Sequence, residues 1–305
     1  MFEPSRRYVI DGAMATELER RGADLNDRLW SAKVLLQSPQ LIEDVHYDYF
    51  CAGADIALSA SYQATFAGFS ARGLTDNEAR ELLLKSVRLA CAARERFAEA
   101  HEDDARAAAL VGASIGPYGA HRHDGSEYRG DYGVSAERIR DFHRRQLEVL
   151  ALSRADFIAF ETVPCLAEGE AIVRLLEEFP ELRAWLSFSC RDALHVCHGE
   201  RFADCAALAD EHSGIIATGI NCSPPEFVES LLAQARGVTT KTLFAYPNSG
   251  ETWRAADNCW LVGASHASLA GLARCWLDAG ATLLGGCCRT TPQDIRELAQ
   301  VMRNS

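Results

Sequence analysis

Apolar and polar positions alternate in blocks along this chain. Short runs of apolar and β-branched residues are separated by longer segments in which apolar residues recur at helical spacing. Eight strand-helix units follow one another at an irregular spacing of roughly 30 to 45 residues. The pattern predicts strands at Tyr8–Asp11, Ile56–Ser59, Leu110–Ile115, Phe157–Glu161, Ala184–Phe188, Ile215–Asn221, Thr242–Tyr246 and Thr282–Gly286.

The segments between these strands carry helix start and stop signals. Capping residues, several of them followed by proline or by an acid three positions on, predict four helix starts. They are Ser38 with Pro39, Thr75 with Glu78, Ser223 with Pro224, and Thr291 with Pro292 and Asp294. Gly53 and Gly280 each close a helix shortly before the next strand, as a left-handed C-terminal residue does.

Strands that are apolar on both faces and separated by helices indicate a parallel sheet covered by helices. Eight units favour closure into a single (β/α)8 TIM barrel of the α/β class. An open doubly wound sheet is the alternative, but it normally carries a glycine-rich turn after its first strand. This chain has Asp11-Gly12-Ala13-Met14 there. Because no Pro/Gly/Ser-rich linker interrupts the pattern, we expect residues 1–305 to form one domain.

Composition and charge narrow the function classes. The chain has 305 residues, of which 48% are hydrophobic and 24% charged, so disorder, collagen and coiled coil are excluded. A net charge of −12 disfavours binding to nucleic acids and to anionic membranes. No apolar run reaches the length of a membrane span, and residues 1–7 lack the apolar core of a signal peptide, so we expect a cytoplasmic protein. The oligomeric state is not indicated.

Polar residues gather where the predicted strands end. The first strand ends at Asp11, the fourth at Glu161 and the sixth at Asn221 and Cys222; Cys287 and Cys288 follow the eighth. In a barrel these ends converge on one mouth. The long connections 116–134 and 247–263 also follow strands, so both are predicted to be lids or binding loops at that mouth.

Three of the eleven cysteines are candidates for a metal site. Cys222, Cys287 and Cys288 supply the three protein ligands of a catalytic zinc site with an open fourth position. Gly285 and Gly286 are expected to give the backbone the freedom that lets adjacent cysteines reach one ion. The predicted helix starts at Ser223 and Thr291 would favour thiolates. From spacing alone, unligated cysteines or a vicinal disulfide remain equally open.

Several segments together resemble the homocysteine S-methyltransferase family from near the first residue to the last helix. They are Asp11-Gly12-Ala13-Met14-Ala15-Thr16-Glu17-Leu18, Ser61-Tyr62-Gln63-Ala64-Thr65, Gly219-Ile220-Asn221-Cys222, Tyr246-Pro247-Asn248-Ser249-Gly250-Glu251 and Gly285-Gly286-Cys287-Cys288-Arg289-Thr290-Thr291-Pro292. The chain is most similar to the cobalamin-independent branch, which takes a methyl group from S-methylmethionine or S-adenosylmethionine. The 124–130 segment, Asp124-Gly125-Ser126-Glu127-Tyr128-Arg129-Gly130, also resembles that branch.

The resemblance implies a zinc-containing barrel that methylates the thiol of L-homocysteine to form methionine. It implies that Cys222, Cys287 and Cys288 bind Zn²⁺, and that Asp11 and Glu161 hold the substrate ammonium group. Either acid could instead cap the following helix.

Further substrate contacts are assigned less directly. Main-chain groups near Ala13 and Met14 are candidates for binding the substrate carboxylate. Asn221 is included with the substrate-binding candidates, although bracing the turn before Cys222 is its favoured role.

Residues on the methyl-donor side are predicted from polar and aromatic character, because acidic or aromatic groups can receive a sulfonium. The candidates are Tyr62, Gln63, Glu127 and Tyr128. His121 and His123 have the side chains of metal ligands, but their place in a polar connection favours a solvated loop.

Other classes of function stay open. A barrel lyase or aldolase could use Gly285–Gly286 and the next helix as a phosphate site, but the only lysines are Lys33, Lys85 and Lys241, and none follows a predicted strand. A zinc hydrolase is disfavoured because three thiolates make a weak Lewis acid. A non-enzymatic zinc or thiol redox sensor would need neither the acid pair nor long lids.

Overall fold

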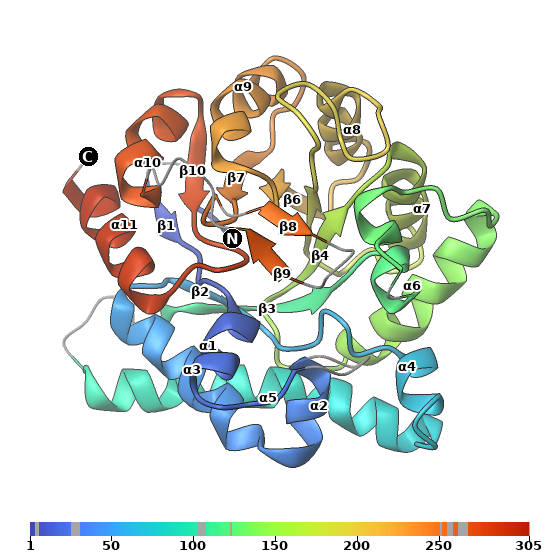
Figure 1. Cartoon of the computed structure of the whole chain (residues 1–305). Helices are drawn as coiled ribbons and strands as arrows, with labels where there is room; N and C mark the ends of the chain where they lie inside the picture. The colour runs from blue at the N-terminus through green and yellow to red at the C-terminus, as the bar shows by residue number, and fades with distance from the viewer. Residues whose placement is uncertain are drawn as a thin grey trace.

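The core of the fold is a parallel sheet of eight strands. The structure is a computed structural model that describes residues 1–3, 6–25, 31–102, 108–122, 124–250, 252–254, 259–261 and 268–304. The strand order is β1-β10-β7-β6-β5-β4-β3-β2 (Figure 1). The strands are β1 (Tyr8–Val9), β2 (Ile56–Leu58), β3 (Leu110–Ile115), β4 (Phe157–Val163), β5 (Ala184–Phe188), β6 (Ile215–Asn221), β7 (Thr242–Tyr246) and β10 (Ala281–Leu284).

Main-chain contacts between the first and second strands close the sheet. Ile10 forms a parallel bridge with Ile56. The Asp11 N–H donates to the Ile56 carbonyl at 2.9 Å, and the Asp55 N–H donates to the Val9 carbonyl at 2.7 Å. The predicted (β/α)8 barrel is therefore confirmed, and the open-sheet alternative is excluded.

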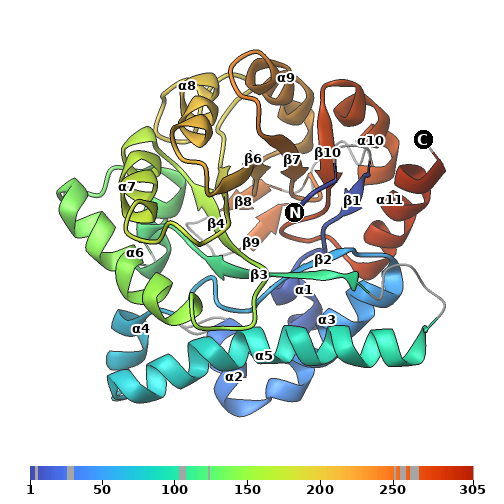
Figure 2. The ribbon, with the colours of Figure 1, turned by 180° about the vertical axis from the view of Figure 1, so that it is seen from behind.

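Helices surround the sheet on its outer side (Figures 1 and 2). The strands are buried on both faces because one face packs on these helices and the other fills the barrel. The α-helices are α1 (Met14–Arg20), α2 (Ser31–Gln37), α3 (Pro39–Ala52), α4 (Phe66–Ser70), α5 (Asp76–Ala100), α6 (Ala136–Leu150), α7 (Leu166–Leu176), α8 (Phe202–Ala207), α9 (Pro225–Arg236), α10 (Leu269–Asp278) and α11 (Pro292–Asn304). The 3₁₀ helices are η2 (Tyr118–Arg122), η3 (Ser126–Tyr128) and η4 (Leu208–Glu211).

Large aromatic side chains fill the barrel interior. The Trp185 ring lies 4.8 Å from the Phe157 ring and 4.5 Å from the Phe244 ring, centroid to centroid. Tyr246 stacks on Phe244 at 5.7 Å. The interior is therefore a packed core, which leaves the ends of the barrel for a site.

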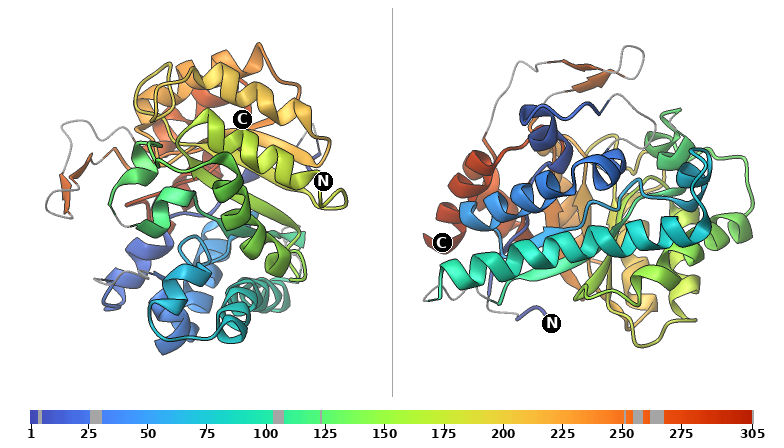
Figure 3. Two further views of the ribbon diagram at one scale, coloured as in Figure 1. Left: turned by 90° about the vertical axis from the view of Figure 1, so that its right-hand side faces the viewer. Right: turned by 90° about the horizontal axis from the view of Figure 1, so that it is seen from below.

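The predicted strand bounds agree with the structure to within two residues at each end. The 247–263 connection is predicted to be a loop, and the structure places two short antiparallel strands within it, β8 (Thr252–Arg254) and β9 (Cys259–Leu261). They stand off from the barrel at the end opposite the N terminus (Figure 3). No helix in the described part of the chain is long and apolar enough to cross a membrane.

Two of the helix-start predictions test the capping logic. Thr75 and Glu78 form a complete capping box at α5, as predicted. The predicted start at Ser223 is wrong, because α9 begins at Pro225 with Pro224 as its N-cap. The Ser223 hydroxyl is used elsewhere: it donates to the Asn221 carbonyl at 2.9 Å and accepts from the Cys190 N–H at 2.8 Å.

Candidate functional site

Three cysteines meet at the carboxyl end of the barrel strands. Cys222 directly follows β6, and Cys287 and Cys288 lie in the turn after β10. The Cys222 Sγ lies 2.8 Å from the Cys287 Sγ and 3.5 Å from the Cys288 Sγ. In the described residues these three form the one group of His, Cys, Asp or Glu side chains whose ligand atoms all lie within 4.8 Å of one another.

Left-handed backbone conformations turn these thiols toward one another. Cys222 has φ of 48°, and Arg289, directly after Cys288, has φ of 67°. Such values are uncommon outside glycine and are typical of functional turns. At these residues the chain turns sharply out of the extended conformation, so that the sulfurs of two separate turns can face a common point.

The expected role of Gly285 and Gly286 is wrong. Neither has a positive φ. What both positions require is close approach: a Cβ at Gly285 would lie 2.6 Å from the Ile10 Cβ, and one at Gly286 would lie 2.4 Å from the Thr290 Oγ1. Gly285 therefore lets the cysteine turn pack against the end of β1, and Gly286 lets it pack against Thr290. Arg289 is the residue of this turn that has the left-handed conformation.

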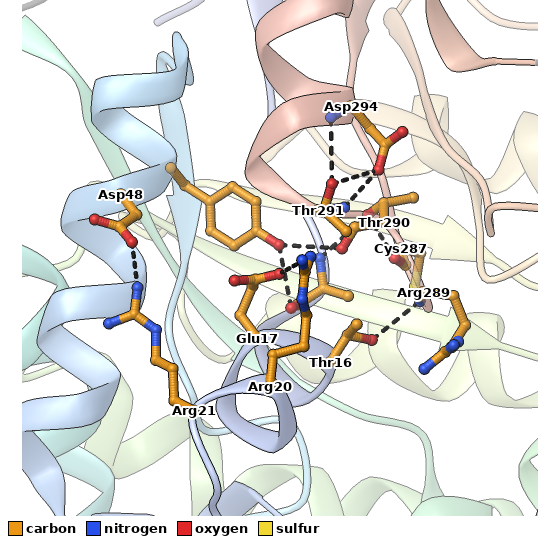
Figure 4. Close-up of polar contacts among 12 residues, drawn as sticks. Thr16, Glu17, Arg20, Arg21, Asp48, Cys287, Arg289, Thr290, Thr291 and Asp294 are labelled. Atoms are coloured by element: carbon orange, nitrogen blue, oxygen red, sulfur yellow. Dashed lines mark hydrogen bonds and ion pairs between the residues drawn. The ribbon is translucent and has the colours of Figure 1, made fainter.

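Thr290 joins the cysteine turn to the turn after β1. Its hydroxyl donates to the Cys287 carbonyl at 2.7 Å and accepts from the Ala13 N–H at 3.2 Å. The buried Tyr49 hydroxyl, from α3, contacts the carbonyls of Ala13 at 3.1 Å and Thr290 at 3.3 Å. Figure 4 shows Thr290 beside Cys287, with Thr16 reaching the Arg289 backbone. The two turns are thus fixed relative to each other.

Hydrogen bonds among the thiols favour one thiolate. The contacts of the Cys222 Sγ with Cys287 and Cys288, together with the bond from the Tyr128 hydroxyl, hold the pKa of Cys222 well below its ordinary value. The same bonds raise the pKa of Cys287 and Cys288. The cluster is therefore poised to place negative charge at one point.

The sulfur positions fit a thiolate-binding metal ion. Tetrahedral metal-sulfur bonds of about 2.3 Å place two sulfurs about 3.8 Å apart. The Cys222-Cys288 separation of 3.5 Å is close to this value, and the Cys222-Cys287 separation of 2.8 Å would widen by about 1 Å when an ion binds. Three sulfurs leave one tetrahedral position for another ligand. The chemistry of this donor set suits Zn²⁺.

Asp11 lies buried at the end of β1. Its Oδ2 accepts a hydrogen bond from the Leu58 N–H at 3.0 Å and lies 4.0 Å from the His46 Nδ1. Burial, and to a lesser extent the charge of Glu161, raise the pKa of Asp11 well above its ordinary value.

Glu161 is the second buried acid at this mouth. Its carboxylate accepts a hydrogen bond from the Ser114 hydroxyl, and its Oε2 accepts one from the Tyr246 hydroxyl at 3.2 Å. Burial raises the pKa of Glu161 to about 7. Two neighbouring acids whose charged forms are both disfavoured make a site that a cation would stabilise.

A strand irregularity positions Glu161. The pairing of β4 with β5 shifts register between Phe160 and Val163, and Thr162 has φ of 61°. Asn221 clamps this irregularity: its Oδ1 accepts from the Thr162 N–H at 2.8 Å, and its Nδ2 donates to the Thr162 Oγ1 at 2.8 Å. The same Oδ1 accepts from the Ser187 hydroxyl at 2.7 Å. These contacts support a bracing role for Asn221.

We expect Asn221→Ala to lower the free energy of unfolding by about 2 to 4 kcal/mol, because it leaves the buried Thr162 N–H without its acceptor. Urea denaturation followed by circular dichroism measures this change. Wild-type stability in the variant would show that Asn221 does not hold the β4 irregularity.

Of the four donor-side candidates, Tyr62, Glu127 and Tyr128 interact with Cys222. The Tyr128 hydroxyl donates to the Cys222 Sγ at 3.8 Å. Tyr62 is half-buried, and its carbonyl accepts from the Gly116 N–H at 3.2 Å. The Gln63 Oε1 and the Glu127 Oε2 are buried and have no hydrogen-bond partner within the described residues. Burial raises the pKa of Glu127.

Of the two histidines in the 116–134 connection, the structure describes only His121. His121 is half-buried, with its ring 4.7 Å from the Tyr118 ring and 4.9 Å from the Phe142 ring. The expected solvated loop is therefore wrong for His121, because aromatic packing holds it. His123 lies outside the described residues.

Sequence reasoning missed the residues that position the site. Ser114 and Tyr246 come from the ends of β3 and β7, so the strand-end rule that found Asp11 could have found them. Tyr49 carried no such signal, because it lies in the middle of a helix.

The fold and the site define a (β/α)8-barrel enzyme with its site at the carboxyl ends of the strands. Residues 8–302 match the family described as homocysteine S-methyltransferase. The chain belongs to the homocysteine S-methyltransferase family. It is 51% identical over 297 residues to the homocysteine S-methyltransferase YbgG of Bacillus subtilis, covering 97% of this chain and 94% of that protein. It is 47% identical to a selenocysteine Se-methyltransferase of Brassica oleracea, covering 95% and 87%.

A solved structure supports the same assignment. The metallated form of the homocysteine methyltransferase MmuM from Escherichia coli superposes with a TM-score of 0.87 at 46% identity, covering 97% of this chain and 96% of that one. The predicted family and fold are therefore confirmed.

Proposed function

We propose that this enzyme transfers a methyl group from a sulfonium donor, S-methylmethionine or S-adenosylmethionine, to the thiol of L-homocysteine, forming methionine with the help of Zn²⁺. The observation that carries the proposal is the meeting of three cysteine sulfurs beside two buried acids at one barrel mouth. The names of the relatives support the reaction class.

Cys222, Cys287 and Cys288 would hold the ion. When bound, Zn²⁺ supplies a means of deprotonating the incoming thiol, whose ordinary pKa of about 8.5 keeps it largely protonated at neutral pH. The three cysteines keep the site electron-rich, which preserves the nucleophilicity of an attacking sulfur. Thr290 and Tyr49 maintain the turn that carries Cys287.

Asp11 and Glu161 would bind the homocysteine ammonium group, which supplies the positive charge that their buried carboxyls lack. The carboxylate of the amino acid would meet the turn after β1. Because the Ala13 N–H already donates to Thr290, Met14 at the start of α1 is the better-placed of the two candidate donors. Holding both ends of homocysteine would fix its thiol relative to the sulfur cluster.

The methyl donor would enter from the side of Tyr62, Gln63, Glu127 and Tyr128. A sulfonium amino acid brings positive charge, and the buried oxygens of Gln63 and Glu127 that lack partners among the described residues are acceptors suited to it. In-line attack on the methyl carbon would then neutralise the donor as the new carbon-sulfur bond forms and the old one breaks.

The proposal is tested by incubating the zinc-loaded enzyme with homocysteine and, in parallel, S-methylmethionine, S-adenosylmethionine or betaine, and measuring methionine. We expect product with one or both sulfonium donors and little with betaine. A lyase, an aldolase or a thiol sensor would form no methionine with any donor.

We expect kcat/KM for homocysteine to fall about tenfold per pH unit below pH 7, because kcat/KM follows the ionisation of the free enzyme. Burial raises the pKa of Glu161 to about 7, and only its ionised form attracts the ammonium group. Glu161→Gln should lower kcat/KM at pH 8 and remove this acidic limb. An unchanged limb in the variant would assign it to another group.

A further inference from the structure

A fully buried carboxylate outside the site holds the connection between β3 and α6. Glu168, in the first turn of α7, has no exposed surface. It accepts hydrogen bonds from the Tyr118 N–H at 2.6 Å, the Tyr132 hydroxyl at 2.6 Å and the His143 Nε2 at 2.8 Å. The last bond assigns a proton to Nε2 of His143. A buried acid is tolerated when it is hydrogen-bonded in this way.

Two of the three donors come from opposite ends of one segment. We call residues 116–122 and 124–134 the lid. Tyr118 opens its first 3₁₀ helix, Tyr132 lies near its end, and their rings pack 5.1 Å apart. The Arg122 guanidinium also donates to the Tyr132 carbonyl at 3.0 Å. Glu168 therefore ties both ends of the lid to α7 at a single point.

Close backbone packing connects these ends to the tip of the lid. A Cβ at Gly119 in η2 would lie 2.4 Å from the Glu127 nitrogen in η3, and the Ser126 hydroxyl donates to the Gly119 carbonyl at 3.4 Å. On the far side of η3, Gly130 has φ of 76°, and a Cβ there would lie 2.9 Å from the Cys165 Cβ. Cys165 is the N-cap of α7.

Within the described residues, one hydrogen bond joins the tip of the lid to the sulfur cluster. The Tyr128 hydroxyl donates to the Cys222 Sγ at 3.8 Å, a long bond to a weak acceptor. A bond of this kind does not hold a loop in place by itself. The three short bonds to a buried carboxylate are far stronger, because hydrogen bonds to charged groups exceed neutral ones.

We propose that Glu168 is a positioning residue that holds the lid closed over the sulfur cluster and thereby places Tyr128 against Cys222. A purely structural role is the competing explanation, since His143 links α6 to α7 through the same carboxylate. If Glu168 positions the lid, its loss should open the lid and expose Cys222. If Glu168 only links α6 to α7, its loss should change helix packing alone. The proposal does not depend on the methyl donor or on the metal.

The test uses the metal-free protein under reducing conditions, without substrate. Iodoacetamide alkylation of Cys222 is followed by peptide mass spectrometry, with the exposed Cys51 as the internal reference. Trypsin cleavage after Arg122 and Arg129 reports opening of the lid. We expect Glu168→Gln to raise both the Cys222 alkylation rate and lid cleavage by about tenfold, which corresponds to the loss of a charge-assisted bond. Cys51 alkylation should not change.

Two further variants complete the design. Tyr132→Phe removes one hydroxyl from the lid side and leaves the His143 bond, so it should shift both readouts in the same direction by a smaller factor, and it serves where Glu168→Gln does not fold. Glu170→Gln changes an exposed acid of the same helix and should match the wild type. A lower melting temperature in Glu168→Gln and Tyr132→Phe with wild-type alkylation and cleavage would overturn the proposal.

Discussion

Cys287→Ser is expected to remove bound zinc and methyl transfer together while leaving the barrel folded. A serine hydroxyl is a much weaker zinc ligand than a cysteine thiolate. The two cysteines that remain are too few protein ligands for a catalytic zinc site. The main-chain bonds of this position, from the Cys287 N–H to the Pro247 carbonyl and from Thr290 to the Cys287 carbonyl, do not involve its sulfur. We expect turnover to fall at least about 10³-fold, since metal activation of a nucleophile accounts for several kcal/mol.

The measurement combines metal analysis, methionine formation and thermal unfolding of one preparation. Cys197→Ser is the matched control, because Cys197 is a half-buried free thiol that lies outside the group of three sulfurs. It should keep metal and activity. Cys222→Ser and Cys288→Ser should behave as Cys287→Ser does. Full turnover in zinc-free Cys287→Ser protein would contradict the metal assignment, whereas the membership of the family would stand.

The sequence is enough to predict the barrel because the relevant signals are local. Ala184–Phe188 and Ile215–Asn221 are apolar on both faces, which is required of a strand between a filled interior and a helical layer. Residues placed just after such strands must converge at one end of a closed barrel. This rule predicted that Cys222 and Cys287 lie close together, although they are far apart in the chain.

The backbone details of the site depend on contacts that no local pattern carries. Backbone freedom was expected of Gly285 and Gly286, but both are needed for close packing, and the left-handed residue of the turn is Arg289. The start of α9 shifts to Pro225 because the Ser223 hydroxyl is taken by Cys190 and Asn221. In both cases a tertiary contact overrides a local preference.

Buried polar partners are the hardest to predict. Tyr49 and Glu168 lie within helices whose sequence pattern only places them on an inward-facing side. The Tyr49 hydroxyl contacts Ala13, which is more than 30 residues away in the chain. The Glu168 carboxylate contacts Tyr118, which is 50 residues away. A sequence shows that such groups need partners, but not which partners the fold provides.

Asp11→Asn should weaken homocysteine binding at least about 30-fold and leave the zinc content unchanged, because truncating one partner of a buried charge pair costs about 2 kcal/mol or more. The amide oxygen can still accept the Leu58 N–H, so the end of β1 should keep its shape. Asp55→Asn is the matched control: Asp55 is also buried and accepts the Val9 N–H at 2.8 Å, but it lies at the start of β2, at the other end of the barrel. Calorimetric titration with homocysteine separates the two variants. An unchanged Kd in Asp11→Asn would mean that Glu161 alone holds the ammonium group and that Asp11 serves only to join β1 to β2.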